Sequence, residues 1–215
     1  MAPRDFQTRL TRRAARAGLT LSDGLLAQLD TFHALLFRWN AKINLTALSD
    51  PDQVIERLFL EPLIAARFLP SGARRLMDVG SGGGSPAIPM KLAAPHVCLT
   101  MVEVKARKSA FLREAVRQLD LSNTTVETSR VEELLTRTDF YEAFDVVSVR
   151  AVRVEMRVLH TLQAFLVPGG QILLFRGPTG PEIPTALVPP LRMEGTYPLV
   201  DSLQSRLTII SKREH

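Results

Sequence analysis

Apolar residues recur at three- and four-residue steps along the first third of the chain. Residues 25–39 carry one such stripe, after Ser22 or Thr20 as a helix cap, and this spacing predicts an amphipathic helix. A second apolar stretch covers residues 54–68 and predicts another helix, although Pro62 lies in its middle. The polar stretch between the two predicts a loop.

The pattern changes from residue 71 onward, where short β-rich runs alternate with helical stretches. We predict strands over residues 76–79, 97–102, 124–128, 144–149 and 171–175, and helices over residues 86–94, 105–119, 131–135 and 154–166. Such alternation is typical of parallel βαβ units in a three-layer α/β sheet. Two last runs, near residues 195–200 and 207–211, are expected to pair as an antiparallel hairpin at the sheet edge. The chain is thus divided into a helical extension, residues 1–70, and an α/β core, residues 71–215.

The composition fits one domain with a modest extension. The 215 residues are 46% hydrophobic and 23% charged, which is typical of a globular protein with a buried core. Lys and Arg number 27 and Asp and Glu 22, a formal charge of +5 that is compatible with a polyanionic partner. The single cysteine, Cys98, excludes an internal disulfide and a cysteine-based zinc cluster. It is predicted to pack in the core on a buried strand, as a thiol kept reduced in the cytoplasm.

Neither a membrane span nor a signal peptide is predicted. No apolar run approaches the ~18 residues that a spanning helix needs, and residues 1–18 lack the apolar stretch of a signal peptide. This first segment carries five arginines against one acidic residue, Asp5. It resembles a transit peptide only faintly, and we favour a solvated basic helix.

A glycine-rich turn follows the first predicted strand of the core. Strand 76–79 runs into residues 80–85, Gly-Ser-Gly-Gly-Gly-Ser, and Pro86 then opens a helix for which Ser85 is the expected cap. Such a turn lets the backbone approach a ligand without a side-chain clash and delivers that ligand to a helix N-terminus. A turn needed only for tight packing is the alternative.

The spacing of the glycines favours one class of cofactor. The motif Asp78-x-Gly80-x-Gly82-x-Gly84 looks like the first motif of class I methyltransferases, and it lacks the third glycine of the dinucleotide fingerprint. Glu103 ends the next predicted strand, where doubly wound sheets place a carboxylate that accepts hydrogen bonds from ribose hydroxyls. We therefore expect a ribose-containing cofactor, S-adenosylmethionine rather than NAD.

Two further segments open at the carboxyl ends of predicted strands. Glu132 can accept a hydrogen bond from an adenine amino group, or it simply marks the acidic start of a helix. Arg150 can hold guanine or phosphate, brace the carboxylate of the cofactor, or form a surface salt bridge. The chain has no Asn/Asp-Pro-Pro-aromatic motif and no cysteine placed as a nucleophile, which disfavours methylation at adenine N6 or pyrimidine carbon 5. An acceptor with a free lone pair, such as guanine N7, remains.

Taken together, these segments resemble the RsmG (GidB) family. The resemblance is carried by Trp39-Asn-Ala-Lys-Ile-Asn-Leu-Thr-Ala47, Asp50-Pro51, residues 78–89, Lys108-Ser-Ala-Phe-Leu-Arg113, Arg130-Val-Glu-Glu133, Arg150-Ala151 and Pro168-Gly-Gly170, and it covers residues 20–212. That family methylates guanine N7 in small-subunit (16S) ribosomal RNA with S-adenosylmethionine. The resemblance implies a Rossmann-like class I methyltransferase fold of the α/β class. It would have a mostly parallel seven-stranded sheet, helices on both faces and an N-terminal helical extension.

The glycine motif, the resemblance and the basic residues on segments that could border the cleft together give a set of expected site residues. The expected cofactor-binding residues are Asp78, Gly80, Gly82, Gly84, Ser85, Glu103, Val131, Glu132 and Arg150, and Arg150 is also the expected catalytic residue. The expected substrate-binding residues are Asn44, Arg57, Arg153 and Arg176. Asn44 fits equally well as a turn-forming or capping residue. The implied partner is 16S rRNA or an assembling small ribosomal subunit, and we expect a cytoplasmic monomer without a membrane or metal partner.

Several positions depart from the usual pattern of the family. Where it usually reads Arg-His-Ile-Leu-Asp-Ser, this chain reads Arg57-Leu-Phe-Leu-Glu61-Pro62, and the usual Leu-Lys-Gly becomes Phe175-Arg176-Gly177. We interpret these changes as lying on the substrate side of the site. Two alternatives therefore stay open: a related class I methyltransferase with another substrate, and a catalytically silent RNA-binding protein of the same fold.

Overall fold

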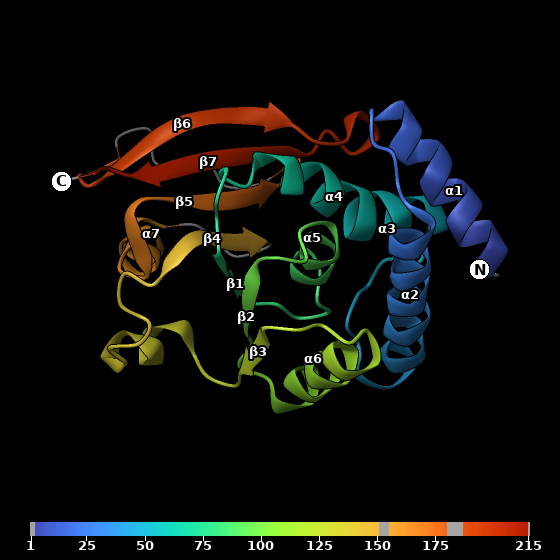
Figure 1. Cartoon of the computed structure of the whole chain (residues 1–215), viewed down its shortest axis with the longest axis horizontal. Helices are drawn as coiled ribbons and strands as arrows, with labels where there is room; N and C mark the ends of the chain where they lie inside the picture. Colours follow the sequence, from blue (N-terminus) through green and yellow to red (C-terminus); the bar gives the residue numbers. More distant parts are fainter. Residues whose placement is uncertain (1–2, 151–154, 180–186, 215) are drawn as a thin grey trace.

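The computed structural model describes residues 3–150, 155–179 and 187–214 (Figure 1). The N-terminal helical part comprises α1 (Pro3–Arg16), α2 (Asp23–Ile43), α3 (Pro51–Ile55), the π-helix η1 (Glu56–Leu60), α4 (Glu61–Ala65) and the 3₁₀-helix η2 (Ala66–Phe68). The rest comprises β1 (Arg75–Val79), α5 (Ala87–Ala93), β2 (Cys98–Val102), α6 (Ala106–Gln118), β3 (Thr124–Glu127), the 3₁₀-helix η3 (Val131–Thr136), β4 (Phe144–Arg150), α7 (Met156–Gln163), β5 (Leu166–Arg176), β6 (Leu191–Pro198), the 3₁₀-helix η4 (Asp201–Leu203) and β7 (Arg206–Lys212).

Seven strands form one sheet in the order β3-β2-β1-β4-β5-β7-β6. The first five strands pair in parallel, β7 runs antiparallel to β5, and β6 runs antiparallel to β7 at the edge (Figure 1). The predicted mostly parallel seven-stranded sheet and its C-terminal hairpin are therefore confirmed. The strand order reverses beside β1, and this is where open α/β sheets bind ligands at the carboxyl ends of their strands.

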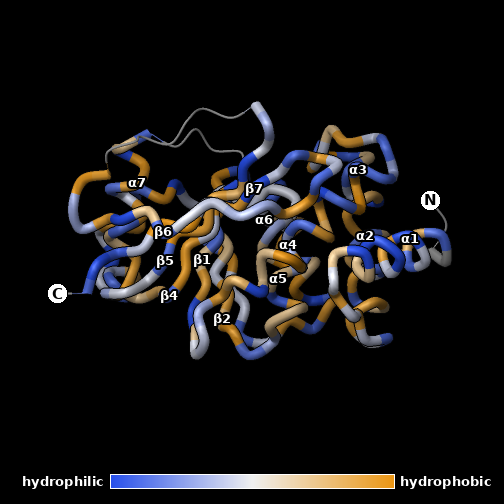
Figure 2. The backbone as a smooth tube through the Cα atoms, turned by 90° about the horizontal axis from the view of Figure 1, so that it is seen from above, coloured by the Kyte–Doolittle hydropathy of each residue, from blue (hydrophilic) through white to orange (hydrophobic). Residues whose placement is uncertain are grey.

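Helices cover both faces of the sheet. Neighbouring residues of a strand point to opposite faces, so each strand contributes side chains to two cores. Leu76 and Val146 face a core shared with α1, α2, α5 and α6, whereas Met77 and Val147 face a second core with η3 and α7. Figure 2 shows the hydrophobic stretches of β1, β4 and β5 side by side in the middle of the molecule. The N-terminal helices thus share a core with the sheet, and the division of the chain at residue 70 stays a prediction.

The basic N-terminal segment is docked on the protein. Phe6, Leu10 and Ala14, four residues apart on α1, are fully buried against the neighbouring helices. The expectation of a merely solvated basic helix is therefore wrong, since one face of the helix belongs to the core.

Three local predictions have different outcomes. Ser22 caps α2 by accepting a hydrogen bond from the Leu25 amide, as predicted. Ser85 does not cap α5, because Pro86 occupies the cap position and the Ser85 hydroxyl donates to another part of the chain. Cys98 is exposed rather than packed in the core, because it begins β2 on the strand face that is left partly open.

No helix within the described ranges is both long and apolar enough to cross a bilayer. In the same part of the chain, no group of three or more His, Cys, Asp or Glu side chains is placed to hold a metal ion.

Candidate cofactor site at the carboxyl ends of the strands

Two pockets meet at Gly80, on either side of the glycine-rich turn. The first, called here the helix-side pocket, has a volume of about 290 Å³ and is lined by Leu36, Leu45, Thr46, Leu48, Arg57, Leu58, Gly80, Ser81, Gly82, Gly83, Ser85 and Arg150. The second, the loop-side pocket, has a volume of about 200 Å³ and is lined by Val79, Gly80, Val102, Glu103, Val104, Ser129, Arg130, Val131 and Glu132. Together they form a divided cleft where the ends of β1, β2 and β4 meet.

The glycines of the turn have two different functions. Gly80 and Gly82 line the cleft, as predicted for residues that let the backbone approach a ligand. Gly84 lines neither pocket, and its φ of +81° is in the left-handed region. A Cβ at Gly84 would lie 2.6 Å from Ile88 Cδ1 and 3.3 Å from Phe32 Cζ. The packing interpretation therefore holds for Gly84, where the turn presses against α5 and α2.

Glu103 follows the end of β2 and is buried in the wall of the loop-side pocket. Its two carboxylate oxygens accept hydrogen bonds from the Gly82 amide at 2.9 Å and the Lys105 amide at 2.8 Å. These bonds fix the carboxylate beside the turn. Each carboxylate oxygen has a second lone pair, so the group can still accept hydrogen bonds from ribose hydroxyls.

The first turn of η3 forms the opposite wall of the loop-side pocket. Val131 is half-buried and Glu132 is exposed, and both line the pocket. Glu133 accepts a hydrogen bond from the Arg130 amide and so closes the start of this helix. The pocket thus has an apolar side chain and a carboxylate at the position where the sequence predicts contacts to adenine.

Arg150 ends β4 and is anchored inside the protein. Its Nη1 donates to the Arg57 carbonyl at 2.6 Å and to the Ser85 hydroxyl at 3.1 Å, and its Nη2 pairs with Glu61 Oε2 at 2.9 Å. The guanidinium also lies 4.7 Å from the centre of the Phe175 ring. Burial lowers the pKa of Arg150 to about 10, so the side chain stays charged at neutral pH. The ion pair is buried, which differs from the surface salt bridge considered as an alternative.

Asp78 lies beneath the turn and lines neither pocket. Its Oδ1 accepts a hydrogen bond from the Ser148 hydroxyl at 2.6 Å, and its backbone carbonyl accepts one from the Ser81 hydroxyl at 3.0 Å. Burial raises the pKa of this carboxyl group. The structure therefore places Asp78 as a support of the turn, not at its ligand-facing side.

The predicted substrate residues are scattered around the cleft. Asn44 is the left-handed C-cap of α2, which agrees with its interpretation as a capping residue. Arg57 lines the helix-side pocket, whereas Arg176 ends β5 and lines neither pocket. Arg153 lies outside the described residues.

The segment after α2 contributes residues of the helix-side pocket that the sequence did not assign to cofactor binding. Leu45, Thr46 and Leu48 line it from the segment after α2. The amides of Leu45 and Thr46 both donate to Asn40 Oδ1, which shapes this segment. The Trp-Asn-x-x-x-Asn-Leu-Thr motif contains Leu45 and Thr46, and the resemblance placed Thr46 beside the site, whereas Leu48 lies two residues beyond the motif and had no such signal.

The two pockets fit a cofactor that joins a nucleoside to an amino acid. The loop-side pocket combines a fixed carboxylate with apolar walls from Val102 and Val131, and the turn supplies glycine backbone at Gly80. The helix-side pocket adds polar groups from Ser85 and Arg150. S-adenosylmethionine has these two parts, so the chemistry of the cleft agrees with the cofactor class predicted from the sequence.

Comparisons with known proteins identify the family of the chain. The family model described as "GidB: rRNA small subunit methyltransferase G" matches residues 25–187. The chain is 37% identical over 161 residues to "Ribosomal RNA small subunit methyltransferase G" of Stenotrophomonas maltophilia, covering 75% of this chain and 73% of that protein. It is 38% identical over 178 residues to the protein of the same name from Burkholderia thailandensis, covering 80% and 75%.

Solved structures share the fold at low sequence identity. A SAM-dependent methyltransferase from Aquifex aeolicus superposes with a TM-score of 0.56 at 16% identity, covering 78% of this chain and 95% of that one. The putative methyltransferase yhhF from Escherichia coli gives 0.52 at 12% identity, covering 86% and 88%. The class I methyltransferase fold predicted from the sequence is confirmed. The chain belongs to the GidB family, that of rRNA small subunit methyltransferase G, to which its motifs pointed.

Proposed function

We propose that this protein transfers a methyl group from S-adenosylmethionine to N7 of a guanine in 16S rRNA, either in the free RNA or in an assembling small subunit. The names of the relatives support the RNA substrate. The observation that carries the proposal is the divided cleft at Gly80, where a fixed carboxylate lines one pocket and a buried arginine the other.

The cofactor is proposed to lie across the glycine-rich turn. Glu103 would accept hydrogen bonds from the ribose, with adenine against Val131 and Glu132 in the loop-side pocket. Ser85 and Arg150 would face the amino-acid end in the helix-side pocket. When bound, S-adenosylmethionine supplies an electrophilic methyl group on a sulfonium.

Guanine N7 carries a lone pair and needs no deprotonation. The protein therefore needs no general base, and its task is to align N7 with the methyl group, an effect worth up to ~7–11 kcal/mol in well-oriented reactions. Arg150 is proposed to keep the wall of the pocket in place for that alignment. Arg57, Arg153 and Arg176 are proposed to contact the RNA. Arg57 lines the helix-side pocket and Arg176 stands at the carboxyl end of β5, whereas Arg153 is proposed from the sequence alone.

The assignment of Glu103 and Arg150 is tested by a kinetic comparison of two variants. Glu103→Ala is expected to weaken S-adenosylmethionine binding, raising its Kd and KM about tenfold while kcat changes little. Arg150→Ala is expected to lower kcat more than it raises KM. Glu114→Ala, which removes a carboxylate of α6 that lines neither pocket, is the control. Unchanged kinetics in the first two variants would contradict both roles.

The substrate is tested in cells that lack the gene. Mass-spectrometric mapping of their 16S rRNA should show the loss of one N7-methylguanine, and the intact gene should restore it. Unchanged N7 methylation would refute the proposed substrate. Isothermal titration calorimetry with S-adenosylmethionine separates the enzyme from a silent RNA-binding protein, since such a protein would show no detectable cofactor binding.

We further propose that the protein works as a monomer in the cytoplasm, where small subunits are assembled. Light scattering coupled to size-exclusion chromatography should give a mass near 23.9 kDa. A mass of twice that value would contradict the monomer.

A further inference from the structure

The π-helix η1 forms the back wall of the helix-side pocket. Its backbone carbonyls are acceptors for two side chains of the site: the Arg57 carbonyl binds Arg150 Nη1 at 2.6 Å, and the Leu58 carbonyl binds the Ser85 hydroxyl at 2.8 Å. Both acceptors belong to one helical turn. The positions of Arg150 and Ser85 thus depend on where this turn lies.

Pro62 explains why these two carbonyls accept hydrogen bonds from side chains. A proline has no N–H, so it cannot donate to the carbonyl four residues earlier, which is Leu58, as an α-helix requires. Nor can it donate to the carbonyl five residues earlier, which is Arg57, as a π-helix requires. The proline therefore leaves two carbonyls without that helical donor, and they are the two that Arg150 and Ser85 use.

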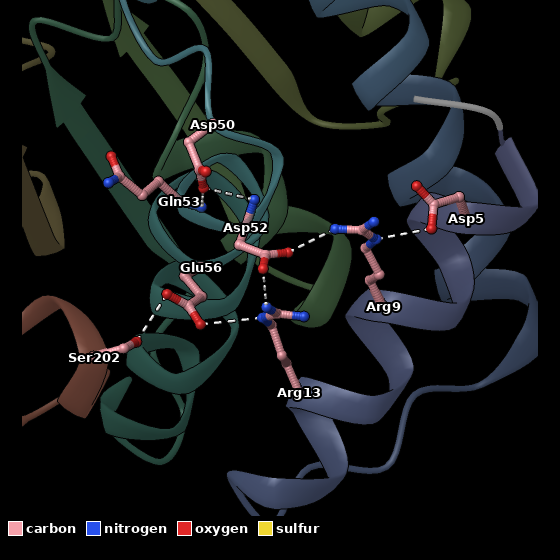
Figure 3. A network of polar contacts seen from close by, with 8 residues as sticks. All are labelled: Asp5, Arg9, Arg13, Asp50, Asp52, Gln53, Glu56 and Ser202. Carbon is pink, nitrogen blue, oxygen red and sulfur yellow. Dashed lines mark hydrogen bonds and ion pairs between the residues drawn. The ribbon is translucent and has the colours of Figure 1, made fainter.

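The opposite side of the same turn is tied to α1 (Figure 3). Arg13 Nε donates to Glu56 Oε1 at 3.1 Å, and its Nη2 pairs with Asp52 Oδ2 at 2.9 Å. The other oxygen of Glu56 accepts a hydrogen bond from Ser202 of η4 at 2.8 Å. Arg9 also pairs with Asp52 but does not reach Glu56. One carboxylate thus joins the first helix, the π-helix and the C-terminal hairpin.

The contact between Arg13 and Glu56 is partly withdrawn from water. The exposed fractions of the two side chains are 13% and 15%, so the solvent screens this pair less than it screens a surface pair. An edge-on contact between Phe6 of α1 and Phe59 of η1, with ring centres 4.8 Å apart, lies alongside it. The ion pair therefore holds η1 on the side that faces α1, away from the helix-side pocket.

We propose that Arg13 and Glu56 are positioning residues for the cofactor site. Glu56 shares a peptide bond with Arg57, so a contact that holds the Glu56 side chain also restrains the carbonyl that anchors Arg150. Loss of the ion pair would let η1 shift and would loosen Arg150 and Ser85 without removing any atom that lines the cleft. This inference rests on the proposed function, because it assigns these residues to S-adenosylmethionine binding.

The test compares two arginine-to-glutamine variants of α1. Arg13→Gln is expected to raise the Kd for S-adenosylmethionine, measured by calorimetry, about 3- to 10-fold. It should also speed hydrogen exchange in the peptide that covers residues 55–62, measured without ligand. Arg12→Gln removes the same charge from an exposed position of the same helix and should change neither quantity.

A double-variant comparison separates positioning from general destabilisation. If Arg13 acts partly through the Leu58 carbonyl, Arg13→Gln should weaken binding less in a Ser85→Ala background than in the wild type. If Arg13→Gln only lowers stability, the folded protein should bind S-adenosylmethionine with an unchanged Kd in both backgrounds, and the proposal is overturned.

The outcomes distinguish this inference from the proposed function. A wild-type protein that binds S-adenosylmethionine, with Arg13→Gln binding it equally well, refutes the positioning role alone. A wild-type protein that shows no binding refutes the proposed function. In that case the exchange rates still decide whether Arg13 holds η1 in place.

Discussion

The ion pair between Glu61 and Arg150 is buried on both sides. The two side chains are 2% and 9% exposed, and a second arginine, Arg57, lies 3.5 Å from the other oxygen of Glu61. Taking both charges out of water is costly, and the pair offsets that cost only while both partners are present. The same carboxylate that anchors the candidate catalytic residue therefore also contributes to stability.

Glu61→Gln should destabilise the protein strongly. The substitution keeps the size of the side chain but leaves a buried guanidinium without its counter-charge, and we expect a loss of about 3 kcal/mol in the free energy of unfolding. Guanidinium chloride denaturation measures this loss. Glu114→Gln is the matched control, because its partner Arg117 is exposed and the expected change is below ~1 kcal/mol. Equal effects of the two substitutions would contradict the prediction.

Gly84→Ala should destabilise the turn. The new Cβ would lie 2.6 Å from Ile88 Cδ1 in a left-handed backbone conformation, so we expect a loss of about 2 kcal/mol. Gly24→Ala provides the comparison, because that glycine lies in the first turn of α2 with no neighbouring atom within 4 Å. It should stabilise the protein by up to ~0.5–1 kcal/mol. Thermal unfolding of both variants checks the opposite signs.

The structure places single residues at the cleft where one local motif identifies them, and their contacts to a cofactor stay predictions. The glycine turn and Glu103 follow from a strand, a turn and a helix that are adjacent in the sequence. The contacts of Ser85 and Arg150 could not be predicted in this way, because their partners Leu58 and Glu61 are 27 and 89 residues away. The sequence therefore suggested Ser85 as a helix cap, and it placed Glu61, which differs from the usual family residue, on the substrate side. In the structure both side chains instead form hydrogen bonds with Arg150 and hold it in place.

At the scale of elements, α1 and α2 are joined by an aromatic cluster around His33. The imidazole stacks on Phe6 with ring centres 4.3 Å apart, and Phe37 and Phe59 lie near it. Burial lowers the pKa of His33 to about 4, against a smaller opposing effect of Asp30. The ring is therefore neutral at physiological pH and acts as one more aromatic side chain between the helices.

This histidine makes stability depend on pH in a defined window. Its pKa is about 4 in the folded protein and 6.5 in the unfolded chain, so between these values the unfolded chain binds more protons. The contribution of His33 to the free energy of unfolding should be constant above pH 6.5. It should fall as the pH drops from 6.5 toward 4, and the loss should be about 1 kcal/mol at pH 5.

The control for this effect is His33→Phe, which keeps an aromatic ring beside Phe6 and removes the titration. Urea unfolding of both proteins at pH 5, 6 and 7.5 measures the difference in stability. That difference should shift in favour of the variant as the pH falls. A difference that does not change with pH would show that His33 is protonated equally in both states.

The elements themselves were largely predictable, and their irregularities were not. Alternating β-rich and helical runs identified the five parallel strands, because each contains a short run of apolar or β-branched residues between turn residues. Strand β5 starts at Leu166, five residues before its predicted start, since the stretch Pro168-Gly-Gly170 looks like a turn but continues the strand. The sequence predicted one helix through Pro62 and did not show the π-helix, because the backbone hydrogen bond from the Glu61 amide to the Glu56 carbonyl has no sequence signature.

At the scale of the whole molecule, the net charge of +5 does not show which of the 27 Lys and Arg side chains are available to a partner. Many of them are used within the fold. The described ion pairs include those of Arg9, Arg13, Arg57, Arg117, Arg137, Arg150, Arg157, Arg192 and Lys212. We therefore expect attraction to RNA to depend on where the cations lie relative to the cleft, and Arg57, whose side chain is 31% exposed beside its ion pair with Glu61, can still face a phosphate there.

The salt dependence of the reaction tests this view of the charge. If basic side chains near the cleft displace counterions from RNA phosphates, kcat/KM for 16S rRNA should fall at least about tenfold between ~50 and ~200 mM salt. The Kd for S-adenosylmethionine is the internal control. It should change little over the same range, because the cofactor carries no phosphate and its pocket is partly buried. A flat salt profile for the RNA reaction would mean that phosphate contacts contribute little to substrate binding, and recognition would then rest on the shape and base contacts of the cleft.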